Sequence, residues 1–279
     1  PEPLPAEVLR RHGIRADKRL GQHFLLDPGI LRRVAAAALP LAGRTVLEVG
    51  PGPGGLTAAL LAAGAGRVVA VERDRRFLPA LAELAQRHPG RLEVVQADAL
   101  AFDPAPLAAA GGPLLVVANL PYNVGTELLL GWLATLGLFE RLVLMFQKEV
   151  ALRLSAQPDT ADWGRLAVLA QRLCRVERLF DLPPAAFAPP PRVSSSVVRL
   201  TPRDDRPEPE AQAALEAVTR AAFGQRRKML RASLRTLVPE PDALLTAAGI
   251  DGTRRAETLA IPELERLAGI WRASRDRGG

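Results

Sequence analysis

The sequence predicts an α/β protein: a doubly wound parallel sheet, followed by a small domain made only of helices. Between residues 27 and 173, segments with a strand pattern alternate with segments with a helix pattern, as in sheets whose parallel strands are joined by helices. The strand segments are apolar almost throughout, which is typical of strands covered on both faces. The first strand runs into a glycine-rich turn and then a helix, as in sheets that bind nucleotides.

The first helix of this series is expected to begin after Asp27, because Asp is a favourable N-cap and Pro28 a favourable first residue. It should run to about Ala38. The expected strands are Thr45–Val49, Arg67–Glu72, Leu92–Asp98, Pro113–Asn119 and Leu142–Phe146. The expected helices are Leu56–Ala63, Arg75–Arg87, Thr126–Leu136, Gln147–Ser155 and Trp163–Leu173.

Two later segments are expected to close the sheet as a hairpin-like pair: Arg175–Leu182 and Ser195–Leu200. Between them, three prolines stiffen the segment Phe187–Arg192. The pattern changes after Thr201, where a charged and proline-rich linker leads into short helices without a strand pattern. We therefore expect a sheet domain over residues 1–202 and a helical domain over residues 203–279.

The composition describes a soluble globular protein, with 48% hydrophobic and 24% charged residues. No apolar run reaches the roughly 18 residues that span a bilayer, and the first residues do not resemble a signal peptide. Cys174 is the only cysteine, and the three histidines are scattered, so we expect no metal site. These features predict a cytoplasmic protein without a membrane partner, which we expect to be a monomer.

The net charge of +7 suits a polyanionic partner, and the cations are unevenly distributed. The stretch Ala217–Pro239 contains six cations and no acid. Arg227, Arg231 and Arg235 recur every four residues, so we expect them on one face of a helix. A stripe of one sign repels itself unless phosphates lie opposite it. The residues expected to contact RNA are Arg226, Arg227, Lys228 and Arg231.

The glycine-rich turn has the spacing of a nucleotide-binding loop, because Gly50, Gly52 and Gly55 fit the pattern G-x-G-x-x-G. Glu72 ends the next strand, where an acid can bind both hydroxyls of a ribose. These features alone fit either a dinucleotide enzyme or a methyltransferase. Glu48, just before the glycines, decides between them, because its carboxylate would oppose a pyrophosphate at the helix N-terminus.

A carboxylate at Glu48 suits a ligand that carries positive charge and no phosphate. S-adenosylmethionine has an ammonium and a sulfonium, so we expect it as the cofactor of a Rossmann-like class I methyltransferase sheet. Asp98 ends the third strand, where it can accept a hydrogen bond from the adenine amino group. The glycines would then allow close approach of the backbone to the cofactor.

The only tyrosine and both asparagines of the chain fall within the five residues Asn119–Asn123. An exocyclic adenine amine is a poor nucleophile, because its lone pair is delocalised into the ring. The side-chain oxygen of Asn119 and the carbonyl of Leu120 can accept from its two N–H bonds, and Pro121 helps aim that carbonyl. Tyr122 offers a face on which an extracted base can stack. We expect Asn123 to cap the following helix.

These motifs together resemble the KsgA/Dim1 family of ribosomal RNA adenine N6,N6-dimethyltransferases, over about residues 18–234. The resemblance rests on the acids and loops described above and on four further segments. These are Lys18–Leu25, Gln147–Val150, Phe187–Pro191 and Gln225–Arg231.

The resemblance implies further roles for individual residues. His23 and Leu25 would contact the cofactor together with Gly50, Gly52, Glu72, Asp98 and Asn119, although many relatives carry Asn at the position of His23. Phe187 matches an aromatic residue that sandwiches the target base opposite Tyr122, with core packing as the alternative. Lys148 and Glu149 match a motif that fits either a surface ion pair within the helix or an RNA contact.

The family also implies the substrate, two adjacent adenosines in a hairpin loop near the 3′ end of the 16S rRNA in the small ribosomal subunit. The nearest alternative is the related large-subunit rRNA adenine methyltransferase of the macrolide-resistance type. Leu120, the three prolines and the C-terminal basic stretch favour the small-subunit enzyme. Another alternative is an assembly factor that mainly binds the subunit, and the intact set of acids argues against it. A dehydrogenase is the least favoured alternative.

Overall fold

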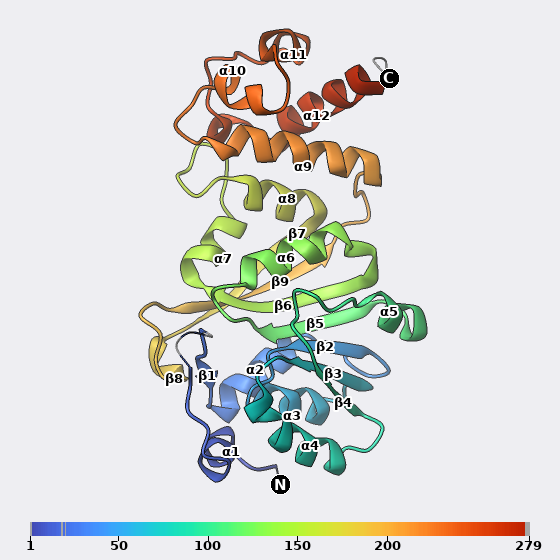
Figure 1. Cartoon of the computed structure of the whole chain (residues 1–279), viewed down its shortest axis with the longest axis vertical. Coiled ribbons are helices and arrows are strands. Elements are labelled where there is room, and N and C mark those ends of the chain that lie inside the picture. The colour runs from blue at the N-terminus through green and yellow to red at the C-terminus, as the bar shows by residue number, and fades with distance from the viewer. Residues whose placement is uncertain (1, 18, 20, 277–279) are drawn as a thin grey trace. The chain divides into compact units, whose positions relative to one another are not determined.

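The computed structural model describes residues 2–17, 19 and 21–276, so Lys18 and Leu20 of the N-terminal motif lie outside the described residues. The chain forms two compact units (Figure 1). The first contains Pro1–Ala151 and Glu177–Pro202, and the second contains Leu152–Val176 and Arg203–Gly279. This division differs from the predicted domains in one segment, because residues 152–176 belong to the helical unit.

The first unit is built on the predicted α/β sheet, with strands in the order β4-β3-β2-β5-β6-β9-β7. The neighbours among β2 to β6 are parallel, and β9 runs antiparallel to β6. The bounds are β2 Thr45–Val49, β3 Arg67–Glu72, β4 Leu92–Gln96, β5 Leu114–Asn119, β6 Phe139–Gln147, β7 Cys174–Leu182 and β9 Ser195–Pro202. The pair β7 and β9 closes the sheet as expected. The strand β4 ends earlier than expected, so Asp98 lies in the loop beyond it.

The helices along this part of the chain precede, connect and follow the parallel strands (Figure 1). They are α1 Pro5–Arg11, α2 Pro28–Ala37, α3 Gly55–Ala62, α4 Leu78–Arg87, α5 Ala105–Gly111, α6 Gly125–Ala134 and α7 Lys148–Leu154. Helix α2 begins as predicted, with the Asp27 carboxylate accepting a hydrogen bond from the amide of Ile30 at 2.9 Å. Helices α1 and α5 were not predicted. Helix α5 has no buried residue, and its sequence lacks the periodic apolar and polar pattern from which a helix can be predicted.

Helices α2 and α3 share one hydrophobic core cluster with alternate residues of the sheet. This cluster includes Val46 of β2 and Val68 of β3, together with Leu31 of α2 and Leu60 of α3. Side chains two residues apart in a strand point to the same face. Glu48 therefore shares the face of Val46 and lies on the side of the sheet that these helices cover.

A small two-stranded sheet joins the N-terminal segment to the proline-rich loop. Strand β1 (Phe24–Leu25) pairs antiparallel with β8 (Phe187–Ala188), so that Phe24 lies opposite Ala188. This pairing brings the predicted cofactor-contacting segment beside a loop more than 160 positions later in the chain.

The second unit is helical in its described part, apart from the start of β7. Its helices are α8 Arg165–Leu173, α9 Pro209–Gly224, α10 Leu230–Ser233, α11 Pro241–Ala247 and α12 Ile261–Asp276. Trp163 is fully buried, and its indole nitrogen donates to the carbonyl of Leu259 at 2.9 Å. This bond ties the segment before α8 to the C-terminal helices. No helix among the described residues is both long and apolar enough to cross a membrane.

The expected single helix through Arg227, Arg231 and Arg235 is wrong. Helix α9 ends at Gly224, a turn carries Arg227, and α10 begins only at Leu230. The short α10 then tightens into a 3-10 turn that contains Arg235. The three arginines are exposed, but they lie on three successive local structures, so the four-residue spacing does not make one helical stripe.

Candidate functional site

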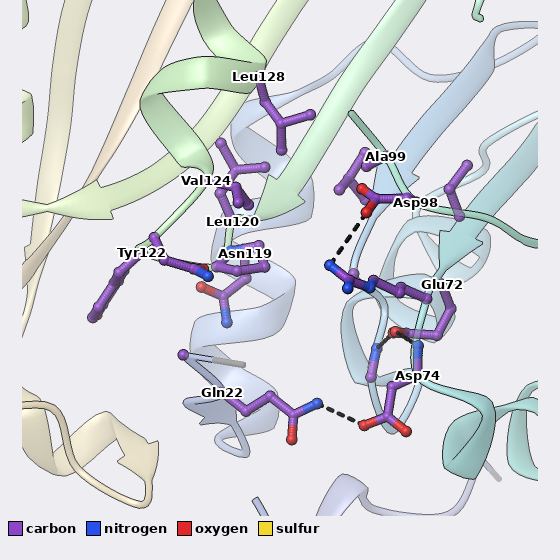
Figure 2. Close-up of a pocket in the computed structure, with 18 of the residues that line it drawn as sticks. Gln22, Glu72, Asp74, Asp98, Ala99, Asn119, Leu120, Tyr122, Val124 and Leu128 are labelled. Carbon is purple, nitrogen blue, oxygen red and sulfur yellow. Dashed lines mark hydrogen bonds and ion pairs between the residues drawn. The ribbon is translucent and has the colours of Figure 1, made fainter. Parts of the chain in front are cut away.

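A pocket lies where β2, β3 and β5 end, and we call it the strand-end pocket (Figure 2). Its lining includes six of the eight predicted cofactor-contacting residues and four of the five predicted catalytic ones. The six are His23, Gly50, Gly52, Glu72, Asp98 and Asn119, and the four are Asn119, Leu120, Pro121 and Tyr122. Parallel strands bring their carboxyl ends to one edge of the sheet, which explains why residues so distant in sequence meet here.

The carboxylate of Glu72 connects two of these strand ends. One oxygen accepts a hydrogen bond from the amide of Gly52 at 3.1 Å, and the other accepts from the amide of Asp74 at 2.7 Å (Figure 2). Burial raises the pKa of Glu72 above its ordinary value, although these amide hydrogen bonds oppose the rise. Gly52 has a φ of 53°, a conformation that favours glycine, and an added Cβ would lie 3.4 Å from the Phe24 ring.

Asp98 lies on the opposite side of the same pocket from Asn119 (Figure 2). One carboxylate oxygen accepts from the amide of Leu100 at 3.1 Å, and the other forms an ion pair with Arg73 at 3.2 Å. A neutral donor such as an aromatic amine could approach this carboxylate if Arg73, which is exposed, moved aside. Arg73 follows Glu72 directly and was not among the predicted site residues.

Glu48 and Leu25 line an adjoining smaller pocket instead, which shares Phe24, Gly50, Gly52 and Asn119 with the strand-end pocket. Glu48 is only 1% exposed, and its Oε2 has no hydrogen-bond partner among the described residues. Burial raises the pKa of Glu48 to about 8, and the charge of Glu72 adds to the rise, whereas the Thr57 hydroxyl opposes it. A buried acid with an unpaired oxygen suits a positively charged partner nearby.

The loop after β5 holds Asn119 in a defined orientation. The Asn119 side-chain nitrogen donates to the main-chain carbonyl of His23 at 3.1 Å, which leaves the side-chain oxygen as the acceptor of this amide. The Pro121 carbonyl accepts from the amides of Val124 at 3.2 Å and Gly125 at 3.0 Å, so the turn is part of the start of α6. Leu120 is buried and anchors the loop.

Tyr122 is held at its hydroxyl and at one face. The hydroxyl is hydrogen-bonded to the hydroxyl of Ser195, a fully buried residue of β9. The His23 imidazole stacks on the Tyr122 ring, with centroids 5.2 Å apart and planes 30° from parallel. Burial raises the pKa of Tyr122 above its ordinary value, although the hydrogen bond with Ser195 opposes the rise, so the hydroxyl is protonated at neutral pH.

Two predicted roles do not match the positions of their residues. Asn123 does not cap α6, because the N-cap is Val124 and no side chain caps the helix; Asn123 instead lines the strand-end pocket. Phe187 is 4% exposed, belongs to the core cluster of α2 and α3, and does not line that pocket. The structure therefore places the Phe187 ring in the core, and its stacking on a base stays a prediction.

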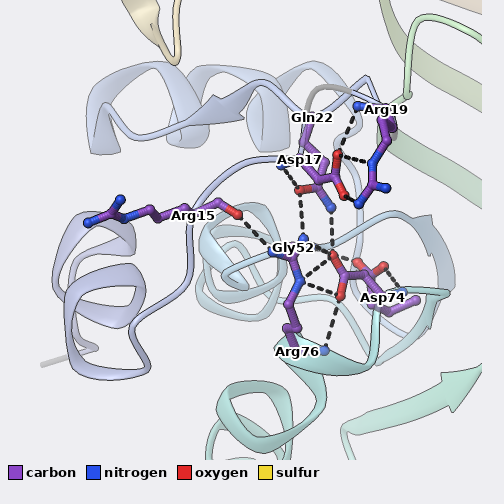
Figure 3. A network of polar contacts seen from close by, with 8 residues as sticks. Arg15, Asp17, Arg19, Gln22, Gly52, Asp74 and Arg76 are labelled. Carbon is purple, nitrogen blue, oxygen red and sulfur yellow. Dashed lines mark hydrogen bonds and ion pairs between the residues drawn. The ribbon is translucent and has the colours of Figure 1, made fainter.

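A polar network fixes the N-terminal segment over the pocket (Figure 3). The Gln22 side chain donates to Asp74 at 2.8 Å and accepts from the amide of Asp17 at 2.9 Å. Arg76 bonds Asp74, the Gln22 side chain and the carbonyl of Arg15. Hydrogen bonds from Arg76 lower the pKa of Asp74 to about 2, so the network stays charged at neutral pH.

Sequence reasoning missed several residues of this pocket, although some carried a signal. Gln22 directly precedes His23, and Asp74 lies two residues after Glu72, just past a strand end. Val124 and Leu128 are four residues apart at the start of α6, so they face the same side of the helix and both line the pocket. Polar residues near a strand end, and apolar pairs at the start of the next helix, are therefore signals from which these pocket residues could be predicted.

Lys148 forms an ion pair with a residue outside α7. Its ammonium lies 2.7 Å from a carboxylate oxygen of Asp181, whose other oxygen accepts from the Ser196 hydroxyl at 2.6 Å. The Lys148 amide also donates to the carbonyl of Ser194 at 2.9 Å. These bonds join the start of α7 to the residues around Ser195, the partner of Tyr122. An RNA contact by Glu149 stays a prediction.

The predicted RNA-contacting residues Arg226, Arg227, Lys228 and Arg231 all lie in the second unit and are exposed. Arg226 donates to the carbonyls of Ala161 and Trp163, so its guanidinium helps to hold the turn after α9. Arg227 and Lys228 lie on that same turn. The turn thus presents cations next to one another without a helix.

Comparison with known proteins identifies the family. Residues 13–270 match the family described as ribosomal RNA adenine dimethylase. The chain belongs to this family. A relative from Methylobacterium radiotolerans, named ribosomal RNA small subunit methyltransferase A, is 59% identical over 276 residues, which cover 98% of this chain and 94% of the relative. A relative of the same name from Rhodopseudomonas palustris is 57% identical, over 94% of this chain and 92% of the relative.

Solved structures of methyltransferases have the same fold. A dimethyladenosine transferase from Plasmodium falciparum aligns with a TM-score of 0.72 and 25% identity, over 88% of this chain and 96% of that chain. The 23S rRNA methyltransferase ErmE aligns with a TM-score of 0.65 and 30% identity, over 88% of this chain and 98% of that chain. The predicted class I methyltransferase fold and the predicted family are both confirmed.

The family implies S-adenosylmethionine as the methyl donor, and the residues of the site fit it. Glu72 offers carboxylate oxygens beside the glycine loop, Gly50 and Gly52 leave room for close approach, and Glu48 supplies a buried carboxyl group whose negative form a bound cation would favour. The two acids, unlike the glycines, would disfavour a phosphate here. The residues that would hold the cofactor are Gly50, Gly52, Glu72, Asp98 and Asn119 in the strand-end pocket and Glu48 in the adjoining pocket.

Replacing Glu48 by Gln tests its burial. In the folded protein Glu48 holds its proton up to about pH 8, but in the unfolded chain only to about 4.5. The folded state therefore binds more protons in this window, and stability falls as the pH rises from 5 to 8. We expect Glu48→Gln, without cofactor, to lose less stability than the unaltered protein over this range.

Urea unfolding at pH 5 and pH 8 measures the difference, which should be on the order of a few kcal/mol. Glu72 also has a raised pKa and is present in both proteins, so the comparison removes its own contribution and leaves that of Glu48 together with the coupling between the two acids. Parallel pH dependences of the two proteins would show that Glu48 is ionised throughout.

Proposed function

We propose that the protein dimethylates the N6 amines of two adjacent adenosines in a hairpin loop near the 3′ end of 16S rRNA, in a late precursor of the small ribosomal subunit. Family membership and the names of the relatives support methyl transfer to small-subunit rRNA. The observation that carries the chemistry is the Asn119 amide, whose nitrogen is bound to the His23 carbonyl and whose oxygen is left as an acceptor.

The residues of the Asn119 loop would act on the amine itself. The Asn119 oxygen and the Leu120 carbonyl accept from its two N–H bonds, which favours a pyramidal nitrogen with an available lone pair. Bound S-adenosylmethionine supplies an electrophilic methyl group. Tyr122 supports the flipped base by stacking, at roughly 1–3 kcal/mol. Loop bases leave their stack more easily than paired ones, which suits a hairpin substrate.

No residue of the site needs to act as a base of shifted pKa, because the methylated ammonium loses its proton readily. We also propose that the protein works as a monomer in the cytoplasm and needs no metal ion, since the acceptors and the cofactor suffice. The similarity to ErmE keeps a 23S rRNA substrate as the alternative. The high identity to small-subunit enzymes over nearly the whole chain favours 16S rRNA.

A direct test incubates the protein with labelled S-adenosylmethionine and small subunits that lack the modification. We expect label in 16S rRNA, recovered as dimethyladenosine at two adjacent positions when the digested RNA is analysed by mass spectrometry. Large subunits serve as the matched control substrate. Label in 23S rRNA, or in neither RNA, would contradict the proposal.

Tyr122→Ala should lower turnover on small subunits about 10- to 100-fold, the range that corresponds to the loss of base stacking. Affinity for S-adenosylmethionine, measured by calorimetry, should change little, because the phenol ring serves the base. Tyr122→Phe is the control: it keeps the stacking face, so it should retain most of the turnover. An equal loss of turnover and cofactor affinity in Tyr122→Ala would assign the ring to structure.

Charge reversal at Arg227 and Arg231 should weaken binding to small subunits and flatten its dependence on salt, because fewer counterions would be released. Binding is measured by filter retention over a series of salt concentrations. A variant with Arg32→Glu and Arg272→Glu has the same change in net charge at exposed residues elsewhere. If both variants bind with the same salt slope, only the total charge matters and the basic turn is not a contact.

A further inference from the structure

We propose that the His23 side chain is a positioning residue for the target base, which it serves by backing the Tyr122 ring. This inference rests on the proposed function and concerns a residue whose expected role was contact with the cofactor. Its basis is a set of four contacts that connect the N-terminal segment, the Asn119 loop, the proline-rich loop and β9.

The imidazole is itself fixed in place before it contacts Tyr122. Its Nδ1 lies 2.8 Å from the carbonyl oxygen of Pro189. A carbonyl can only accept, so Nδ1 must carry the hydrogen and donate it. The pairing of β1 with β8 ends at Phe24 and Ala188, so the next residues outward, His23 and Pro189, lie close enough for this side-chain bond. The ring therefore has a defined rotation.

The fixed imidazole then restricts the orientation of the Tyr122 ring. The two rings stack at 5.2 Å with planes 30° apart, and the phenol hydroxyl is tied to the buried Ser195. An aromatic ring has two faces, and His23 covers one of them. In this arrangement an extracted adenine can stack only on the opposite face, so His23, Tyr122 and the base would form three consecutive layers.

The main chain of His23 has a separate role in the same site. Its carbonyl oxygen accepts from the Asn119 side chain at 3.1 Å and so orients the amide that faces the amine. Replacing the side chain leaves this carbonyl and the β1–β8 pairing in place. A variant of His23 therefore separates the backing of Tyr122 from the orientation of Asn119. His23 is also only partly buried, so the fold should tolerate the change.

The chain offers a direct probe, because Tyr122 is its only tyrosine. Full-length protein labelled with 3-fluorotyrosine should give a single fluorine resonance. We expect His23→Ala to shift or broaden this resonance, and His23→Phe, which keeps a stacking ring, to restore most of it. Arg10→Ala, an exposed change outside the site, is the control and should leave the resonance unchanged.

Kinetics separate this role from contact with the cofactor. With small subunits that lack the modification, His23→Ala should lower turnover about 5- to 10-fold, and its dissociation constant for S-adenosylmethionine should stay within about twofold. His23→Phe should recover most of the turnover. In a Tyr122→Ala background, His23→Ala should cause no further loss, because the ring that it backs is gone.

Three outcomes would overturn the proposal. The first is an unchanged fluorine resonance in His23→Ala. The second is a loss of cofactor affinity as large as the loss of turnover, which would make His23 a cofactor residue. The third is independent, multiplicative losses in the double variant. If the unaltered protein methylates no small-subunit rRNA, the proposed function fails, and the fluorine resonance still decides whether His23 positions Tyr122.

Discussion

The site depends on the parallel register of β3, β2 and β5, which brings the ends of three distant segments to one edge of the sheet. Glu72 fixes this edge locally, because its carboxylate bonds the glycine loop after β2 and the loop after β3. The N-terminal segment is then added to that edge through Gln22 and His23. Without the shared edge, none of these short-range bonds could form.

Much of this arrangement could be predicted from the sequence, because it follows from local patterns. Alternating strands and helices imply a parallel sheet, and the last residues of such strands converge, so Glu72 and Asn119 could be placed without coordinates. The burial of Glu48 could not be predicted in the same way. Because alternate residues of a strand point to opposite faces, Glu48 lies on the face covered by α3 and lines the adjoining smaller pocket. Its position just before the glycines suggested the strand-end pocket instead.

Other errors arose where contacts with other residues, near or distant in sequence, outweigh the preference of a single residue. Asn123 has the chemistry of a helix cap, but the turn at Pro121 makes Val124 the first flanking residue. The spacing of Arg227 and Arg231 fits a helix, but α9 already ends at Gly224. The turn that follows is held by Arg226, which donates to main-chain carbonyls that lie more than 60 residues earlier in the chain. The stack of His23 on Tyr122 joins residues 99 positions apart (122 − 23), so no local pattern could reveal it.

The division of the chain into two units determines which fragments of the protein can fold by themselves. Residues 152–176 lie in sequence within the sheet domain, yet the buried Trp163 in this segment bonds the Leu259 carbonyl, and the Leu173 carbonyl accepts from the Arg203 amide. A fragment that stops at residue 202 would keep this segment and lose its partners, and the apolar side of α8 would face water. The methyltransferase fold is thus not a separable folding unit in the linear chain, and proteolysis after β9 would leave an aggregation-prone product.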